Sequence, residues 1–203
     1  MQGRYRRMSG TFHIPPMVSE TLIARCKAHD RKAQYELYRA LYGMMMGICS
    51  RYERDRQEAT ARMNQGFLKI LTQLDGRRAE VPFEAWARRI MINTVIDAFR
   101  KDKQRRAVEA SGPILEEAGD PQMNEYLAHM EAEAFAALLM RVPLMSRTVF
   151  NLFAIDGFSH AEVAEMLGLS EGTTKWHVSH ARSVLRDAIA TEALARPVKT
   201  VSR

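Results

Sequence analysis

Apolar residues recur at helical spacing through the first half of the chain. In residues 31–52 they lie three or four positions apart, and Asp30 precedes them as the expected N-cap. The spacing continues over residues 56–74, and Pro82 stands where a third helix, residues 82–101, is expected to begin. The apolar face of the first helix consists of Tyr35, Tyr38, Leu41, Tyr42, Met45, Ile48 and Cys49. No segment alternates with period two for long enough to form a strand, so the pattern predicts a helical bundle.

The second half of the chain is predicted to be helical as well. One helix is expected over residues 121–141, and Pro143 is expected to begin another that ends at Asp156-Gly157. The predicted fold class is therefore all-α, with two small helical domains.

A capped short helix follows in the sequence. Ser159 and Glu162 have the spacing of a capping box, in which each side chain accepts a hydrogen bond from an otherwise unpaired backbone N–H. The helix over residues 161–167 is expected to stop at Gly168, and Ser170 is expected to cap a last helix that continues to about residue 193.

A short helix, a turn with glycine and a longer helix are typical of a helix-turn-helix motif. A buried stripe is predicted along the longer helix at Thr174, Val178, Ala181 and Leu185. Its remaining residues are mostly polar or cationic, as expected for contacts with base edges and phosphates in a major groove. They are Glu171, Thr173, Lys175, Trp176, His177, Ser179, His180 and Arg182. The alternative interpretation is a solvated helix in a helical hairpin.

The composition is that of a basic globular protein. Of 203 residues 46% are hydrophobic, and 30 Lys and Arg outnumber 24 Asp and Glu. This balance is compatible with a polyanionic partner. The chain has no run of about 20 apolar residues, and its basic N-terminus lacks the apolar core of a signal peptide, so we expect a cytoplasmic protein without membrane insertion. Its two cysteines cannot form a disulfide framework or, by themselves, a zinc site.

The distribution of charge predicts a linker between two domains. Basic residues dominate residues 86–106, whereas residues 107–138 contain acids and neither Lys nor Arg. The predicted order is a basic tail (1–19), a helical domain (20–104), a linker (105–121), a helix-turn-helix domain (122–194) and a C-terminal tail (195–203).

Two sets of motifs carry a resemblance to a known family. Residues 172–182, with Leu185 after them and Val142-Pro143 and residues 147–150 before them, resemble region 4 of the sigma-70 family. Residues 67–70, 83–86 and 89–100 resemble region 2. The order and spacing are similar to those of the extracytoplasmic-function (ECF) sigma factors, which keep regions 2 and 4 alone.

The resemblance implies a subunit that binds core RNA polymerase and directs it to promoter DNA. Region 2 would open the −10 element, and region 4 would read the −35 element as duplex. A membrane-associated anti-sigma factor is a further partner that the resemblance implies. Catalytic activity, a cofactor and a metal are not expected. The acidic linker is interpreted as a spacer, or alternatively as a segment that lies in the RNA exit path or folds back on the basic faces through Glu109, Glu116, Glu117 and Asp120.

The resemblance also assigns residues to the −10 element. Residues 76–82 resemble the loop that captures a flipped base, and a basic groove with a hydrogen-bonding side chain is what strand opening requires. The −10 residues predicted in this way are Arg77, Arg78, Arg88, Arg89, Asn93, Asp97, Arg100 and Lys101. The alternative interpretation of the arginines is a solvated face. Trp86 is predicted to be a core residue rather than a stacking platform.

The polymerase-binding helix departs from the family pattern. The predicted contacts with core polymerase are Glu58, Asn64, Gln65, Phe67 and Leu68. The family usually has an acidic cluster just before the Phe, but here Thr60, Ala61 and Gln65 replace carboxylates and Arg62 adds a positive charge. A basic partner surface would therefore meet less complementary charge.

Two other function classes and one degenerate form are the alternatives. An enzyme lacks a positive feature, because His177 and His180 have the spacing of metal ligands but no third ligand follows. A helix-turn-helix regulator would bind duplex DNA without polymerase, usually as a dimer on a palindrome. A degenerate sigma factor would act through protein–protein contacts alone.

Overall fold

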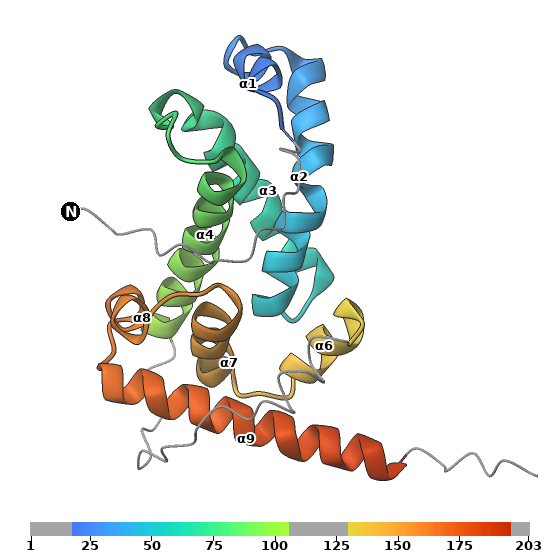
Figure 1. The fold of residues 1–203 in the computed structure, drawn as a ribbon, viewed down its shortest axis with the longest axis vertical. Helices are drawn as coiled ribbons and strands as arrows, with labels where there is room; N and C mark the ends of the chain where they lie inside the picture. The colour runs from blue at the N-terminus through green and yellow to red at the C-terminus, as the bar shows by residue number, and fades with distance from the viewer. Residues whose placement is uncertain (1–17, 106–129, 196–203) are drawn as a thin grey trace, which may run out of the picture.

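The structure, a computed structural model, describes residues 18–105 and 130–195, and these ranges contain helices and no strand. An N-terminal unit and a C-terminal unit lie one above the other in Figure 1. The N-terminal unit consists of α1 (Glu20–Lys27), α2 (Arg31–Tyr52), α3 (Arg56–Thr72), the short 3-10 helix η1 (Leu74–Gly76) and α4 (Phe83–Arg105). The C-terminal unit consists of α6 (Ala132–Leu139), α7 (Leu144–Phe150), the π-helix η2 (Asn151–Ile155), α8 (His160–Leu167) and α9 (Glu171–Ala195). The predicted all-α fold class is confirmed.

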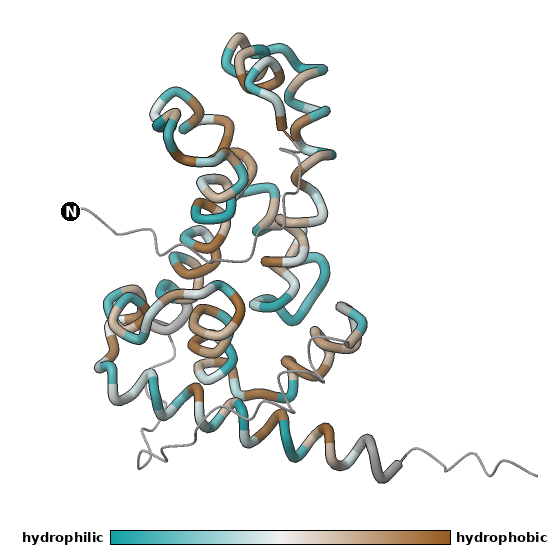
Figure 2. The backbone as a smooth tube through the Cα atoms, viewed as in Figure 1, coloured by the Kyte–Doolittle hydropathy of each residue, from teal (hydrophilic) through white to brown (hydrophobic). Residues whose placement is uncertain are grey.

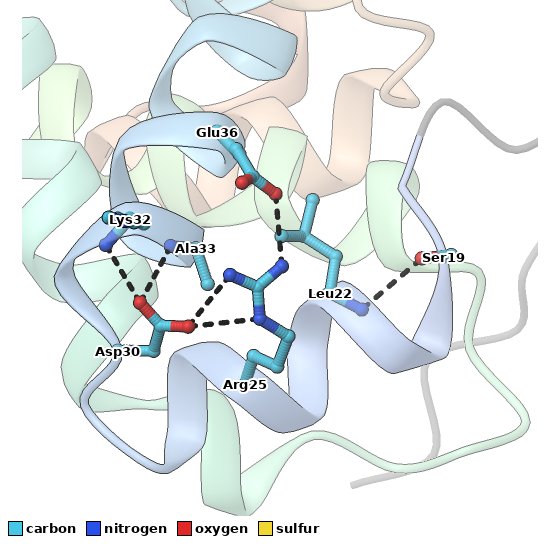
Figure 3. A network of polar contacts seen from close by, with 7 residues as sticks. All are labelled: Ser19, Leu22, Arg25, Asp30, Lys32, Ala33 and Glu36. Atoms are coloured by element: carbon cyan, nitrogen blue, oxygen red, sulfur yellow. Dashed lines mark hydrogen bonds and ion pairs between the residues drawn. The ribbon is translucent and has the colours of Figure 1, made fainter.

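Side-chain caps define where the first helices begin. Asp30 Oδ1 accepts hydrogen bonds from the backbone N–H of Lys32 (2.8 Å) and Ala33 (3.2 Å), which confirms the predicted N-cap of α2 (Figure 3). Asp30 Oδ2 accepts from Arg25 Nη2 at 2.7 Å, and Arg25 also reaches Glu36 at 3.3 Å (Figure 3). The hydrogen bond from Arg25 lowers the pKa of Asp30, so the cap stays ionised and ties α1 to α2.

The core of the N-terminal unit lies between α2, α3 and α4. Figure 2 shows apolar and polar stretches alternating along α2 and α4, as expected for helices with one buried face. α3 and α4 approach closely at Gly66, where an added Cβ would lie 2.3 Å from Met91 Sδ. Trp86 is half-buried and packs against this core beside Phe83, with ring centroids 5.6 Å apart, which agrees with the core interpretation.

Part of the apolar face predicted for α2 is wrong. Tyr35 is 63% exposed and Tyr42 is 38% exposed, whereas the buried stripe runs through Leu37, Leu41 and Met45. The physical reason is helical phase: Tyr35 lies two positions from Leu37, about 200° around the helix, and so faces away from the core. The two tyrosines instead add exposed aromatic surface.

Other predicted helix bounds differ from the structure. The helix expected over residues 121–141 is not continuous within the described residues, because α6 begins at Ala132 and Glu131 is its N-cap. α4 begins at Phe83 rather than Pro82, since the Pro82 carbonyl accepts from the N–H of Trp86 at 3.1 Å and so stands just before the helix. The single helix expected from Pro143 is divided, because five residues after α7 form the π-helix η2.

Several sequence predictions lie outside the described residues. These are the linker from residue 106 onward with its four named acids, the start of the helix expected at residue 121, and most of both tails. Among the helices that are described, none has the length and apolar character needed to cross a membrane.

Candidate nucleic-acid interface

The helix-turn-helix in the C-terminal unit has the predicted caps. The Ser159 and Glu162 side chains complete the capping box at the start of α8, and these hydrogen bonds lower the pKa of Glu162. α8 ends at Gly168, which has φ +64 and ψ 45, a left-handed conformation that suits glycine. Ser170 Oγ then accepts from the N–H of Thr173 at 3.0 Å and caps α9. The turn is therefore determined by short-range chemistry.

α9 lies across α7 and α8 (Figure 1). Thr174, Val178, Ala181 and Leu185 are all at most 3% exposed, as predicted. Thr174 Oγ1 also lies 3.0 Å from His160 Nδ1, and the His160 ring stacks on Phe153. Burial, followed by the charge of Lys175, lowers the pKa of His160, so this imidazole is neutral at pH 7.

The predicted outward face of α9 is only partly outward. Glu171 and Lys175 are exposed, and Thr173, Trp176, His180 and Arg182 are half-buried. His177 (5% exposed) and Ser179 (7% exposed) are buried, so their expected position on the DNA-facing surface is wrong. The buried sector of α9 is wider than the four-residue stripe because α7 packs against it.

A serine on α7 accounts for the position of the two imidazoles. Ser146 Oγ lies 2.9 Å from His177 Nδ1 and 3.0 Å from His180 Nδ1. The hydroxyl has one proton, so it can donate to at most one of the two rings, and the direction of each hydrogen bond depends on the tautomer of the imidazole. Trp176 stacks on His180, with ring centroids 4.9 Å apart, so Ser146 orients the aromatic group at the start of α9 indirectly.

A second polar face runs along α4 in the N-terminal unit. Most of the predicted −10 residues on and before this helix are exposed: Arg78, Arg89, Asn93, Asp97, Arg100 and Lys101. Arg88 is half-buried, and Asp97 is paired with Lys69 at 3.1 Å. Arg77 differs, because its side chain is 6% exposed, pairs with Glu20 and donates to the Val81 carbonyl. Arg77 therefore holds its own loop in place, and its side chain is not exposed for contact with DNA.

The basic side chains of α4 meet the C-terminal unit. Arg88 Nη2 lies 3.0 Å from Asp156 Oδ1, and the Arg89 guanidinium lies 5.0 Å from the centroid of Phe158. Arg100 Nη2 donates to the Glu165 carbonyl at 3.1 Å. No sequence pattern predicted these contacts between the units.

The predicted polymerase-binding surface is exposed on α3. Glu58, Asn64, Gln65 and Leu68 are exposed, and Phe67 is half-buried. Neighbouring groups order this surface: Tyr38 donates to Asn64 at 3.3 Å and packs edge-on against Phe67, and Arg62 donates to Gln65 at 3.0 Å.

Aromatic side chains of α2 lie beside this surface, since Tyr38 packs against Phe67 and Tyr42 lies against Tyr38. Leu68 is 61% exposed, and with Tyr35 and Tyr42 it makes up the exposed large hydrophobic residues found in the described part of the chain. The surface is therefore aromatic and weakly charged rather than acidic.

Metal chemistry has no support within the described residues. No cluster of three or more His, Cys, Asp or Glu side chains in residues 18–105 and 130–195 is arranged to hold a metal ion. His177 and His180 instead share Ser146, as described above.

Comparison with protein families identifies both units. Residues 37–106 match sigma-70 region 2, and residues 132–185 match sigma-70 region 4. The chain is similar to the ECF RNA polymerase sigma factor SigM of Mycobacterium tuberculosis, with 25% identity over 166 residues, 81% of each chain. It is also similar to the ECF RNA polymerase sigma factor SigW of Bacillus subtilis, with 24% identity covering 84% of this chain and 96% of that one.

Among solved structures, the chain is similar to the sigma factor RpoE of Bartonella quintana in complex with the anti-sigma factor NepR. The identity is 17% and the TM-score 0.48, with 78% of this chain and 97% of that chain covered.

The chain therefore belongs to the sigma-70 family of RNA polymerase sigma factors, in its extracytoplasmic-function group. Sigma factors are transcription initiation factors. A regulator that binds duplex DNA without polymerase is not favoured, because residues 37–106 match a sigma-70 region.

Proposed function

We propose that this sigma factor directs core polymerase to two-part promoters, with α4 on the −10 element and the start of α9 on the −35 element. The observation that carries the proposal is the row Arg89, Asn93, Asp97 and Arg100, which are exposed and lie three or four positions apart on one face of α4. Two guanidinium groups with an amide between them supply backbone charge neutralisation and a base-edge hydrogen bond on one surface.

The −35 contact is proposed for the side chains of α9 that remain accessible. Lys175 is exposed, and Trp176, His180 and Arg182 are half-buried beside it. A helix-turn-helix places the first turns of its second helix in the major groove. In α9 these residues lie in the first turns. His177 and Ser179 support this surface from beneath and are not proposed as contacts.

The proposed polymerase-binding surface consists of Glu58, Asn64, Gln65, Phe67 and Leu68 on α3, extended by the exposed tyrosines of α2. Because the surface is mainly neutral and aromatic, its affinity for polymerase should come from apolar burial. We accordingly expect weak dependence of core binding on salt.

Two further expectations follow from the family. An anti-sigma factor, membrane-associated as the family resemblance implies, is proposed as a regulatory partner, and the site of action is proposed to be the cytoplasm, where core polymerase is found. No catalytic activity of its own is expected for the chain. Affinity purification of the full chain from the source organism would test the partner, since recovery of core polymerase alone would argue against a dedicated inhibitor.

Run-off transcription tests the proposed function. Purified core polymerase from the source organism is combined with the chain on a genomic promoter library, and transcripts that depend on the chain are sequenced. Lys175→Ala should weaken use of promoters by about 1–3 kcal/mol if it touches a base, with relaxed preference at one −35 position. Arg89→Ala should weaken opening of the −10 element.

Lys32→Ala is the matched control, because Lys32 is an exposed cation that is not among the proposed DNA contacts. Unchanged promoter choice in both site variants, or an equal loss in the Lys32 control, would contradict the assignment.

A further inference from the structure

A buried carboxylate joins the two units. The Asp156 side chain has no exposed surface, and three donors of the N-terminal unit surround it. Arg51 Nη2 lies at 2.6 Å, Tyr52 Oη at 2.9 Å and Arg88 Nη2 at 3.0 Å. An ionised carboxylate removed from water requires such donors, because burial without them is strongly unfavourable.

The donor set is one that also suits a phosphate group. Guanidinium groups and tyrosine hydroxyls are common donors to phosphate oxygens, and two guanidinium groups from different helices converge here on one anion. Burial, followed by the charge of Asp156, raises the pKa of Tyr52 well above its usual range, so its hydroxyl stays protonated and donates. The three side chains therefore form an anion site that a carboxylate occupies.

The backbone behind these donors is held by the C-terminal unit. Asn151 Nδ2 donates to the Arg51 carbonyl at 3.0 Å, and the buried Arg147 reaches the Tyr52 carbonyl at 3.4 Å. These two carbonyls belong to the last turn of α2, where backbone carbonyl groups have no hydrogen-bond partner within their own helix.

The contact engages guanidinium groups of the surface proposed for the −10 element, although Arg89 and Arg100 stay exposed. Arg88 is held by Asp156, Arg89 packs on Phe158, and Arg100 donates to the carbonyl of Glu165. A DNA strand on α4 and the C-terminal unit in this position would use the same guanidinium groups. A bound strand and the C-terminal unit would therefore compete for these groups.

We propose that Arg51, Tyr52 and Arg88 form a binding site for a phosphate group of the promoter strand, which Asp156 fills in the DNA-free chain. The proposal rests on the proposed function in one respect, namely that the −10 strand lies on α4. When a phosphate replaces the carboxylate, the C-terminal unit is released from α4 and becomes free to reach the −35 element.

The first measurement follows the distance between the units without polymerase. Fluorophores are attached through Lys32→Cys on α2 and Ala190→Cys on α9, both exposed, while the native Cys26 and Cys49 are buried. Adding Asp156→Asn to this labelled chain should lower the transfer efficiency, because the amide cannot neutralise two guanidinium groups. Glu36→Gln removes one surface carboxylate at another place and should leave the efficiency unchanged.

The second measurement follows the anion site itself. A fluorescent single-stranded oligodeoxynucleotide of mixed sequence should bind the Asp156→Asn chain about tenfold more tightly than the unsubstituted chain, the equivalent of one charge-assisted hydrogen bond. Adding Arg51→Gln should abolish this gain while the units stay apart. Equal affinities for Asp156→Asn and Glu36→Gln would overturn the proposal.

A third measurement needs no substitution at the site and covers the case in which Asp156→Asn fails to fold. Inorganic phosphate should lower the transfer efficiency of the labelled chain more than sodium chloride at matched ionic strength. Identical responses to the two salts would overturn the proposal. Since none of these measurements uses polymerase, loss of promoter-dependent transcription would count against the proposed function and not against the anion site.

Discussion

The glycine that ends α8 allows a prediction whose sign depends on the backbone alone. Gly168 has φ +64, and a Cβ placed there would meet no atom within 4 Å. Gly168→Ala therefore adds no clash with another side chain, and its cost is that of a left-handed conformation with a Cβ, about 1–2 kcal/mol of the free energy of unfolding. Gly168→Asn should cost less, because Asn tolerates this conformation better.

Gly47 is the matched control for Gly168. It lies inside α2, and an added Cβ there would also meet no atom within 4 Å. Since the backbone is right-handed helical, Gly47→Ala should raise the free energy of unfolding by roughly 0.5–1 kcal/mol. The same chemical change is thus expected to have opposite signs at the two sites.

Urea denaturation followed by far-ultraviolet circular dichroism measures both effects. The midpoint should fall for Gly168→Ala and rise for Gly47→Ala, with the slope of the transition unchanged. A Gly168→Ala chain as stable as the unsubstituted one, or a loss of stability at Gly47, would refute the reasoning from backbone conformation.

Three other substitutions or treatments have defined outcomes. Hydrogen bonds from Ser159 lower the pKa of Glu162 below its ordinary value of 4.5, so the stability that the ionised group adds is present above that pH and is lost as pH falls through the lowered value. In urea titrations, the difference in free energy of unfolding between the native chain and Glu162→Gln should therefore shrink in acid. A difference that stays constant with pH would contradict this. Gly66→Val should lower the free energy of unfolding by about 1–3 kcal/mol, because its Cβ would overlap the end of the Met91 side chain, which is fully buried and can move aside only by disturbing the core. A calorimetric melting temperature equal to that of the native chain would argue against this close approach. Burial raises the pKa of Cys49 to about 12, so this thiol should react with a disulfide reagent at mildly alkaline pH after unfolding in urea and not before, and rapid labelling of the folded chain would show that it is accessible.

Helix ends and turns were predictable because their chemistry is local. The Asp30 cap, the Ser159–Glu162 capping box and the Gly168 stop each depend on residues within four positions of one another, and all three are confirmed. The phase of an apolar stripe was less certain, as Tyr35 shows: helical spacing identifies a helix, but which of several apolar residues face the core depends on the helices that pack against it.

The site was predicted in outline and not in its contacts. The exposure of Asn93 and Lys175 agrees with the sequence interpretation, whereas the burial of His177 depends on Ser146, which lies 31 positions earlier in the chain. Asp156 and Arg51 are 105 positions apart, and next to Gly157 the acid had the pattern of an ordinary turn residue. No spacing rule joins residues so far apart, so only the folded chain shows the pair.

The number of residues in the π-helix η2, between α7 and α8, determines the direction in which Asp156 points. The defining hydrogen bond of η2 runs from the Asp156 N–H to the Asn151 carbonyl at 2.8 Å. This bond spans one residue more than the corresponding bond of an α-helix. Deleting a single codon within residues 151–155 would restore an ordinary helix and rotate the following residue by about 100°. Asp156 would then point away from Arg51 and Arg88 although no residue of the anion site had been substituted. Relatives that differ by one residue in this segment would thus differ in how their two units associate, a divergence that percentage identity does not register.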